Sequence, residues 1–226
     1  MSIKKKRNLR ELIHGKATWT EPLSSNDKAL GFRGWHSRGY LPHFDVPGQL
    51  QMITYRLHDA MPAELRHEWA QLLEIKEERE QRIKIEEYLD VGRGECLLRQ
   101  PKIAALVEGN LLHFDDARYR LIAWVVMPNH IHVLVEIWEL PMSLVVKNWK
   151  SFTSGAANRQ LGRAGSFWQA DYFDRFIRDR EHLQKAIRYI ENNPVKAGLV
   201  KSPAEWPFSS ARFRDVRSAN TQHSVR

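Results

Sequence analysis

Residues 118–137, RYRLIAWVVMPNHIHVLVEI, contain two apolar runs separated by a three-residue break. Both runs, 118–126 and 131–137, are rich in β-branched and aromatic side chains, which favour strands. The break, Met127-Pro128-Asn129, is short enough for the two strands to pair as antiparallel neighbours. The remaining elements are expected to pack around this strand pair.

A strand and two helices are expected before the strand pair. Residues 49–57 follow a Pro-Gly turn signal and have the composition of a strand. Residues 62–90 predict a long helix, because apolar side chains recur at three- and four-residue spacings in its first half. Residues 101–114 predict a second helix that opens with a proline.

A helix, a strand and a terminal helix are expected after the pair. Residues 143–161 predict a helix with Ser143 as its N-cap, and residues 172–178 predict a strand. Residues 179–193 predict the last helix, which opens on an aspartate and is stopped by Pro194. This order predicts an α+β protein with a ferredoxin-like split βαβ antiparallel sheet, in which residues 130–137 form a central strand.

Charge is distributed unevenly along the 226 residues, whose net charge is +8. Residues 1–10 carry five Lys or Arg and no acid, and residues 147–226 carry 15 basic against 7 acidic residues. Residues 1–37 show no sustained period and are expected to form a flexible basic arm. A basic end of this kind favours a polyanionic partner such as nucleic acid, although many basic proteins have none.

Cysteine content and hydropathy limit the cellular compartments in which the protein is expected. A single cysteine, Cys96, excludes an intramolecular disulfide and favours a reducing cytoplasm. No apolar run reaches the roughly 20 residues of a membrane helix, and the basic N-terminus is not followed by the apolar stretch of a secretory signal. We therefore expect a cytoplasmic protein with no membrane partner.

His130 and His132 form the first candidate site. Side chains alternate across a strand, so both imidazoles point to one face and can converge on a metal ion. The spacing is equally compatible with two structural histidines. A histidine-triad hydrolase is disfavoured because Leu134 stands where a third histidine is needed, and a thiolate zinc site lacks its cysteines.

The last helix carries the second candidate site. Tyr189 and Asn193 are four residues apart and share a helical face, so a phenol and a metal-capable amide lie together. Packing of Tyr189 and helix termination at Asn193 are the alternative interpretation. Tyr172 is a rival nucleophile, but it lies in a predicted strand and has no metal-capable partner four residues away.

Several segments carry a family resemblance, and they follow one another in order over residues 38–212. They are RGYLPHFD (38–45), YLDVGRGECLLR (88–99), MPNHIHVL (127–134), WKSFT (149–153), FWQADYFDRFIRD (167–179), YIENNPVKAGLV (189–200) and WPFSSAR (206–212). With them the chain resembles the REP-associated tyrosine transposases, a branch of the single-tyrosine HUH enzymes. Residues 38–212 are then the transposase domain and residues 213–226 a C-terminal tail.

The resemblance implies roles for the candidate residues. His130 and His132 match the histidine pair that binds the metal, Mg²⁺ or Mn²⁺, and Tyr189 matches the nucleophile. Asn193 stands where many relatives carry a glutamine as third metal ligand, a departure that concerns this ligand alone. The implied activity is metal-dependent nicking and transfer of single-stranded DNA through a 5′-phosphotyrosine, with palindromic hairpins as substrate.

The basic C-terminal third supplies candidate DNA contacts. The side chains expected to contact phosphates are Lys147, Lys150, Arg175 and Arg178, and those expected to stack on bases are Trp149 and Trp168. Two other functions stay open: a metal-dependent nuclease that uses water, and a hairpin-binding regulator without catalysis. The short connection into the last helix favours a helix that folds back on its own domain, and hence a monomer.

Overall fold

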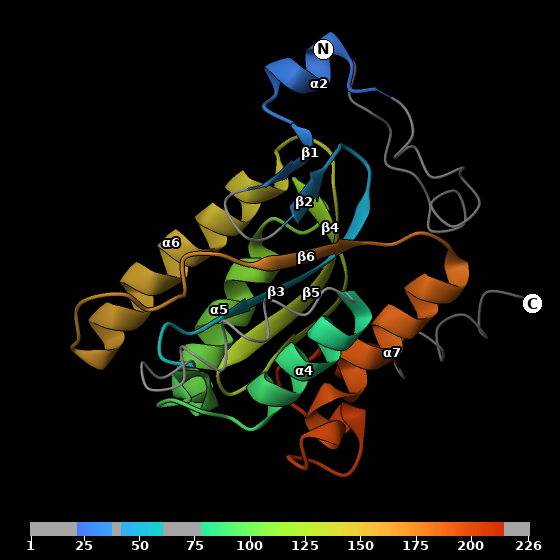
Figure 1. Cartoon of the computed structure of the whole chain (residues 1–226). Helices are drawn as coiled ribbons and strands as arrows, with labels where there is room; N and C mark the ends of the chain where they lie inside the picture. The colour runs from blue at the N-terminus through green and yellow to red at the C-terminus, as the bar shows by residue number, and fades with distance from the viewer. Residues whose placement is uncertain (1–21, 38–41, 61–77, 215–226) are drawn as a thin grey trace, which may run out of the picture.

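The computed structural model describes residues 22–37, 42–60 and 78–214. Its elements, in chain order, are α2 (Ser25–Ala29), β1 (Gly34–Ser37), β2 (Pro42–Asp45), β3 (Leu50–Arg56), α4 (Glu78–Asp90), η3 (Leu97–Arg99), α5 (Pro101–His113), β4 (Tyr119–Val126), β5 (His130–Ile137), α6 (Met142–Leu161), β6 (Phe173–Phe176), α7 (Arg180–Lys196), η4 (Pro203–Glu205) and η5 (Ser210–Phe213). Figure 1 shows the helices arranged around one four-stranded sheet.

The four-stranded sheet has the order β4-β5-β3-β6, and all neighbours are antiparallel. The chain passes from β3 through α4 and α5 to β4, turns into β5, and returns through α6 to β6. This connectivity confirms the predicted ferredoxin-like split βαβ sheet. Strand β5 lies in the interior between β4 and β3, and all eight of its residues are buried.

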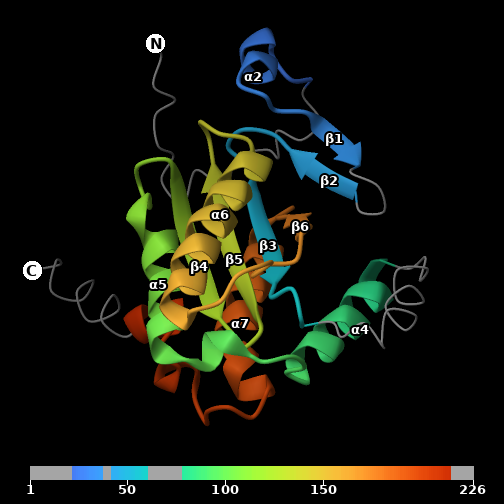
Figure 2. The same cartoon turned by 90° about the vertical axis from the view of Figure 1, so that its left-hand side faces the viewer.

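The helices lie on two sides of this sheet. Helices α5 and α6 contact each other and cover one face, whereas α7 packs against β4 and β5 from the other (Figure 2). Ile131 and Val133 belong to the large core under α5 and α6, and Leu134 belongs to the smaller core under α7. The alternation of β5 therefore sends His130 and His132 to the α7 side.

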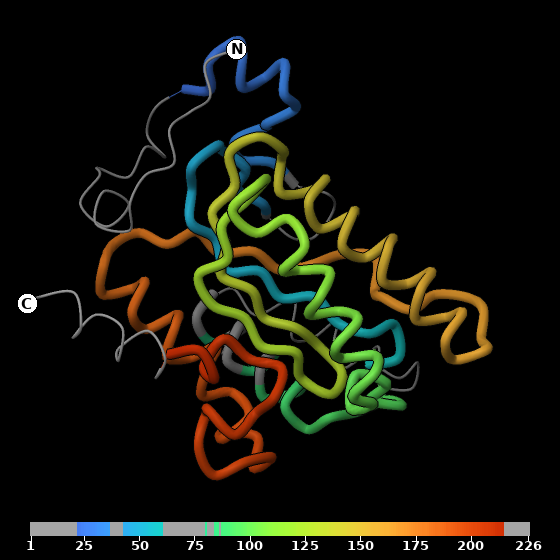
Figure 3. The backbone as a smooth tube through the Cα atoms, turned by 180° about the vertical axis from the view of Figure 1, so that it is seen from behind, coloured from blue at the N-terminus to red at the C-terminus, as the bar shows by residue number. Residues whose placement is uncertain are grey.

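The outer edge of β4 is covered by a C-terminal segment, residues 208–212. Val126 N donates to Phe208 O at 2.9 Å, and the backbone N of Trp124 donates to Ser210 Oγ at 3.1 Å. Figure 3 shows this segment beside the β4–β5 hairpin. Arg212 makes a two-pronged contact with Glu108 of α5 at 2.8 Å on both prongs. The covering of an edge strand limits pairing with other chains.

Two helix ends differ from those expected. Helix α6 begins at Met142 with Pro141 as its N-cap, so Ser143 lies inside the helix. Helix α7 begins after the N-cap Asp179, as expected, but it continues through Pro194 to Lys196. Proline removes one helical N–H bond, and here it lies only two residues before the helix ends. The loss is therefore confined to the final turn, which Ala197 N closes by donating to Asn193 O at 2.9 Å.

The N-terminal region contains structure that the sequence analysis missed. Strand β1 pairs with β2 in a separate antiparallel sheet, and Ser24 and Asp27 form a capping box at the start of α2. The expectation of an irregular arm up to residue 37 is thus wrong for the described part of that segment, and the expected boundary after residue 37 divides a strand pair. The missed signal is weak because each strand has only four residues.

Other expectations fall partly on residues that the structure does not describe. Helix α4 confirms the second half of the helix expected over 62–90, and its first half lies outside the described residues. Residues 1–21 and most of the expected tail at 213–226 also lie outside the described residues. Within the described residues, no helix combines the length and the apolar character that crossing a membrane requires.

Candidate metal and tyrosine site

Two histidine rings meet on the α7 side of β5. His130 and His132 are each about 1% exposed, and their Nε2 atoms lie 3.1 Å apart. The ring planes are nearly perpendicular, with centroids separated by 4.8 Å. The alternation of a strand places both rings on one side, and the rotation of the rings brings their outer nitrogens together.

A hydrogen-bond network orients the first ring. The amide nitrogen of Asn129 donates to the carbonyl oxygens of Leu89 at 3.3 Å and Arg93 at 3.1 Å. Its amide oxygen is thereby left to accept from His130 Nδ1 at 2.8 Å. The network assigns the proton of His130 to Nδ1, so Nε2 carries a lone pair.

The second ring is held from the neighbouring strand. Thr54 stands opposite His132 in the β3–β5 register, and its hydroxyl lies 2.7 Å from His132 Nδ1. When Nδ1 of His132 carries the proton and donates to the Thr54 hydroxyl, both Nε2 atoms are acceptors. Ring orientation through the inner nitrogen is the usual arrangement around metal-binding imidazoles.

Both imidazoles are held in the neutral form. Burial, together with the charges of Arg56 and Lys196, lowers the pKa of His130 to about 3. Burial also lowers the pKa of His132 well below its usual range, assisted by His130 and Lys196. Neutral imidazole is the form that binds metal, and two lone pairs that face each other at 3.1 Å favour a shared cation.

Tyr189 reaches this pair from α7. Its hydroxyl lies 3.4 Å from His132 Nε2, and the two rings meet edge to face with centroids 5.3 Å apart. The helix is positioned by its apolar face, because Leu183, Ala186 and Ile190 are buried against the sheet. Its start is fixed by Asp179, whose carboxylate accepts from His182 N at 2.7 Å.

Asn193 lies one turn beyond Tyr189 and is 1% exposed. Among the described residues, neither its amide oxygen nor its amide nitrogen has a hydrogen-bond partner, although buried amides normally have one. Within the described part of the chain, no group of three His, Cys, Asp or Glu side chains is placed to hold a metal. A third ligand from these residues is therefore of another type, and an amide oxygen suits a hard cation.

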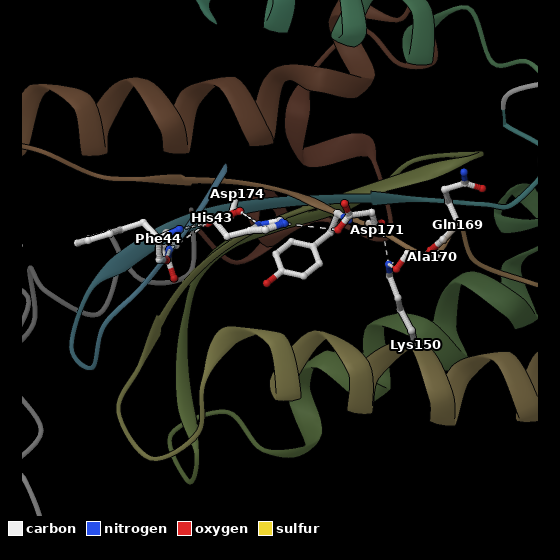
Figure 4. A network of polar contacts seen from close by, with 9 residues as sticks. His43, Phe44, Lys150, Gln169, Ala170, Asp171 and Asp174 are labelled. Carbon is white, nitrogen blue, oxygen red and sulfur yellow. Dashed lines mark hydrogen bonds and ion pairs between the residues drawn. The ribbon is translucent and has the colours of Figure 1, made fainter. Parts of the chain in front are cut away.

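Three of the side chains expected to contact DNA are occupied elsewhere. Trp149 and Trp168 are 2% and 7% exposed, and their indole nitrogens donate to Tyr119 and Thr153. Neither ring offers a face to a base, so core packing replaces the expected stacking. Lys150 Nζ donates to three backbone oxygens, those of Gln169, Ala170 and Asp171, at 2.8–3.1 Å (Figure 4).

The other three basic candidates lie in different places. Lys147 is exposed on α6, on the face of the sheet opposite to Tyr189. Arg175 stands opposite Met52 in the β3–β6 register, on the same side as His132, and is partly exposed. Arg178 is exposed between β6 and α7. Of these three, only Arg175 is placed by the strand register on the face that carries the histidines.

The rival nucleophile Tyr172 is separated from the histidine pair. It is buried on the α5–α6 side, where its ring packs against His43 with centroids 4.8 Å apart. Two side chains that orient the histidines, those of Thr54 and Asn129, were not predicted from the sequence. Lys185, Arg188 and Lys196 on α7 were not predicted either, although their spacings of three and eight residues indicate a shared side of the helix.

Comparison with known proteins agrees with this geometry. Residues 112–193 match the family model described as "Transposase IS200 like", a stretch that includes the histidine pair, Tyr189 and Asn193. Over this segment the chain is similar to the IS200-like transposases. The resemblance stated from the sequence motifs is therefore confirmed for the segment that carries the site.

Two bacterial proteins are similar to part of this chain. A REP-associated tyrosine transposase of Escherichia coli (strain K12) is 34% identical over 107 residues, which are 45% of this chain and 59% of that protein. A putative REP-associated tyrosine transposase of Haemophilus influenzae is 30% identical over 114 residues, which are 44% of this chain and 62% of that protein. The chain thus spans about three fifths of the length of these relatives.

A solved structure shows the same fold. It is described as a REP-associated tyrosine transposase bound to a REP hairpin, and it superposes with a TM-score of 0.51 at 20% identity. The match covers 78% of this chain and 84% of the other. At this identity the likeness supports the arrangement of sheet and helices, and it assigns no ligand to this chain.

Proposed function

We propose that the protein is a metal-dependent transposase that cuts and rejoins single-stranded DNA through a covalent bond to Tyr189. The observation that carries the proposal is the 3.4 Å approach of the Tyr189 hydroxyl to Nε2 of His132. A phenol beside two neutral imidazoles that share one cation is the arrangement that the transfer of a phosphodiester to tyrosine requires.

The donor set fits a divalent cation. His130 and His132 would each supply Nε2, and Asn193 would supply its amide oxygen, which has no partner within the described chain. Nitrogen ligands favour Mn²⁺ over Mg²⁺, whereas the amide oxygen suits both ions. Such an ion, when bound, polarises a phosphate oxygen and neutralises the charge that develops on it.

The reaction assigned to Tyr189 conserves the energy of the bond that it breaks. Its phenolic oxygen forms a bond to phosphorus, the bond from phosphorus to the 3′ oxygen breaks, and that oxygen leaves as a hydroxyl after taking up a proton. A phenol has an ordinary pKa of about 10, so it ionises more readily than a sugar hydroxyl. The resulting 5′-phosphotyrosine can be attacked by another 3′-hydroxyl, which joins two strands without ATP.

The substrate proposed is single-stranded DNA that carries a palindromic hairpin. The net charge of +8 favours a polyanionic partner. The solved structure of similar fold is described as bound to a REP hairpin, which motivates the choice of hairpins as the first substrates to test. Arg175 lies on the histidine-bearing face, and Arg178 is exposed in the connection to α7.

Covalent capture tests the proposal. The full chain is incubated with hairpin oligonucleotides labelled at either end, with Mg²⁺ or Mn²⁺, and run on denaturing gels. We expect a metal-dependent adduct that retains the 3′ label and disappears in Tyr189→Phe. Tyr172→Phe is the matched control, because it removes a buried tyrosine hydroxyl on the other side of the sheet, and it should retain the adduct.

The other possible outcomes would assign a different function to the protein. Cleavage without an adduct that survives Tyr189→Phe would replace the proposal with a nuclease that uses water. Hairpins from the protein's own genomic neighbourhood would also be tested. If they bind tightly and are not cleaved, the proposal would be replaced by a non-catalytic regulator.

A further inference from the structure

A groove of about 510 Å³ lies along α7 and has Tyr189 in its wall. Its other lining residues are Lys185, Arg188, Glu191, Asn192, Lys196 and Pro203. Three of these side chains are cationic and one is anionic. The groove therefore has an excess of positive charge next to the phenol that the proposed function makes the nucleophile.

The single carboxylate in the groove is already engaged. Glu191 Oε1 accepts from Ser210 Oγ at 2.6 Å and from Arg214 Nε at 2.7 Å. Arg214 thus compensates the charge of Glu191. Lys196 pairs with Asp90 at 2.8 Å and Lys185 with Glu181 at 2.5 Å, through carboxylates that do not line the groove. The Lys185–Glu181 pair is exposed, and exposed ion pairs contribute little, so a phosphate can replace Glu181 as the partner of Lys185. Arg188 is also exposed, so its charged end is accessible to a ligand from solvent.

The basic residues form one stripe along α7, distinct from its buried stripe. The groove is lined at positions 185, 188, 189, 192 and 196, spacings that keep side chains on one side of a helix. The buried stripe runs through Leu183, Ala186 and Ile190. Two stripes of this kind let α7 pack on the sheet while it presents a line of charge to solvent.

Tyr189 connects the groove to the histidine pair. Its ring lines the groove, and its hydroxyl lies 3.4 Å from His132 Nε2. A phosphate at that hydroxyl therefore lies within the basic stripe, one helical turn after Lys185 and about two turns before Lys196. The adjoining phosphates of the same strand have Arg188 and Lys185 within the groove as cationic neighbours.

We propose that this groove binds the sugar–phosphate backbone of the single strand that leads away from the phosphate attacked by Tyr189. This inference rests on the proposed function and adds a substrate path that none of the expected DNA contacts included. Lysine and arginine recognise phosphates without reading bases, so the groove contributes affinity that is independent of sequence and sensitive to salt.

The salt dependence of binding tests the path. The full chain is titrated with a fluorescein-labelled oligothymidylate of about 15 nucleotides in EDTA at several salt concentrations. Each phosphate contact to a single strand adds about 0.7 to the slope of log K against log salt. We expect the double variant Lys185→Gln/Arg188→Gln to lower the slope by about 1.4. If affinities converge at 1 M salt, this corresponds to about 25-fold weaker binding at 0.1 M.

A matched pair of variants controls for net charge. Lys102→Gln/Arg159→Gln removes two exposed cations from α5 and α6, on the other face of the sheet, and should leave slope and affinity near wild-type values. Equal losses in both double variants would overturn the inference, because a general field would then explain the binding. Melting temperatures of both double variants verify that these exposed changes leave the fold intact.

The experiments distinguish a failure of the inference about the groove from a failure of the proposed function. The inference that the groove binds DNA would be disproved by either of two results. One is a salt slope unchanged in Lys185→Gln/Arg188→Gln, and the other is no binding of the oligothymidylate by the wild type. The covalent adduct with hairpin DNA is measured independently, so its presence would leave the tyrosine mechanism intact in either case.

Discussion

The hydroxyl of Tyr189 lies 3.4 Å from Nε2 of His132, although 57 positions separate the two residues in the chain. The approach depends on β5 being an interior strand and on α7 packing against β4 and β5 of its own chain. A site that combines a phenol with a histidine pair is therefore assembled within one polypeptide. The predicted monomer stays a prediction, which sedimentation of the full chain will test.

Divalent metal should stabilise the fold through the histidine pair. A ligand at 100 times its dissociation constant adds about 2.7 kcal/mol to the free energy of unfolding. For a domain of this size that raises the melting temperature by roughly 5–10 °C. We expect Mn²⁺ to produce such a shift in the wild type and none in His132→Ala, measured by calorimetry. Tyr189→Phe should keep the shift, and an undiminished shift in His132→Ala would disprove the assignment of the pair.

Replacing Asn193 by leucine should separate stability from metal binding. A buried amide without hydrogen bonds is unfavourable, and leucine has the same number of side-chain heavy atoms in the same branched arrangement. We expect Asn193→Leu to raise the free energy of unfolding without metal by roughly 1 kcal/mol and to abolish the Mn²⁺-induced shift. Urea titrations with and without Mn²⁺ measure both effects.

A carboxylate at position 193 provides the opposite control. Asn193→Asp should lower stability without metal, because it buries a charge, and should keep or enlarge the Mn²⁺-induced shift. The ligand assignment fails if Asn193→Leu retains the wild-type response to Mn²⁺.

The parts of the site that could be predicted are those governed by local periodicity. Alternation along 130–137 placed His130 and His132 on one face, and four-residue spacing placed Tyr189 and Asn193 together. The antiparallel order followed from the sequence of strands and helices. These features depend on neighbours in the chain, so sequence alone carries them.

The features that were missed depend on which groups meet from distant segments. Trp149 and Lys150 are consecutive in a basic, aromatic stretch, yet one is buried in the core and the other binds the backbone of residues 169–171. Their sequence pattern is the same whether α6 presents them to DNA or to the sheet. The continuation of α7 through Pro194 likewise depends on the packing of its last turn.

The stability of the β1–β2 sheet should depend on pH through His43. This buried histidine contacts Asp174 through Nδ1 and lies 3.5 Å from Asp171 through Nε2 (Figure 4). Burial alone would lower its pKa, but the hydrogen bonds and charges of Asp171 and Asp174 outweigh that effect and raise the pKa to about 9. The folded protein therefore holds this proton more tightly than the unfolded chain does.

The sign of the effect follows from that difference. Because the pKa is raised from 6.5 to about 9 on folding, the stabilisation is complete below pH 6.5 and is lost as pH rises through 9. The shift corresponds to roughly 3 kcal/mol. Urea titrations of the wild type and His43→Gln should differ most at low pH and converge above pH 9. A difference independent of pH would show that His43 is not protonated in the fold.

Lys150 should act on stability and leave DNA binding unchanged. Its ammonium donates to the carbonyl oxygens of Gln169, Ala170 and Asp171, which leaves it poorly placed to reach a phosphate. Hydrogen bonds from a charged group contribute roughly 1.5–3 kcal/mol, and Lys150→Gln should lower the free energy of unfolding by about that amount. Denaturant titration measures the loss, and the salt dependence of oligonucleotide binding measures any phosphate contact.

Lys147 provides the matched control, because it is exposed on the same helix and carries the same charge. Lys147→Gln should change the free energy of unfolding by no more than about 0.5 kcal/mol. If Lys150 contacts a phosphate instead, Lys150→Gln will lower the salt slope by about 0.7 while stability stays near the wild-type value. The two roles of this lysine thus predict opposite pairs of results, because a side chain that holds three backbone carbonyls is not available to the strand.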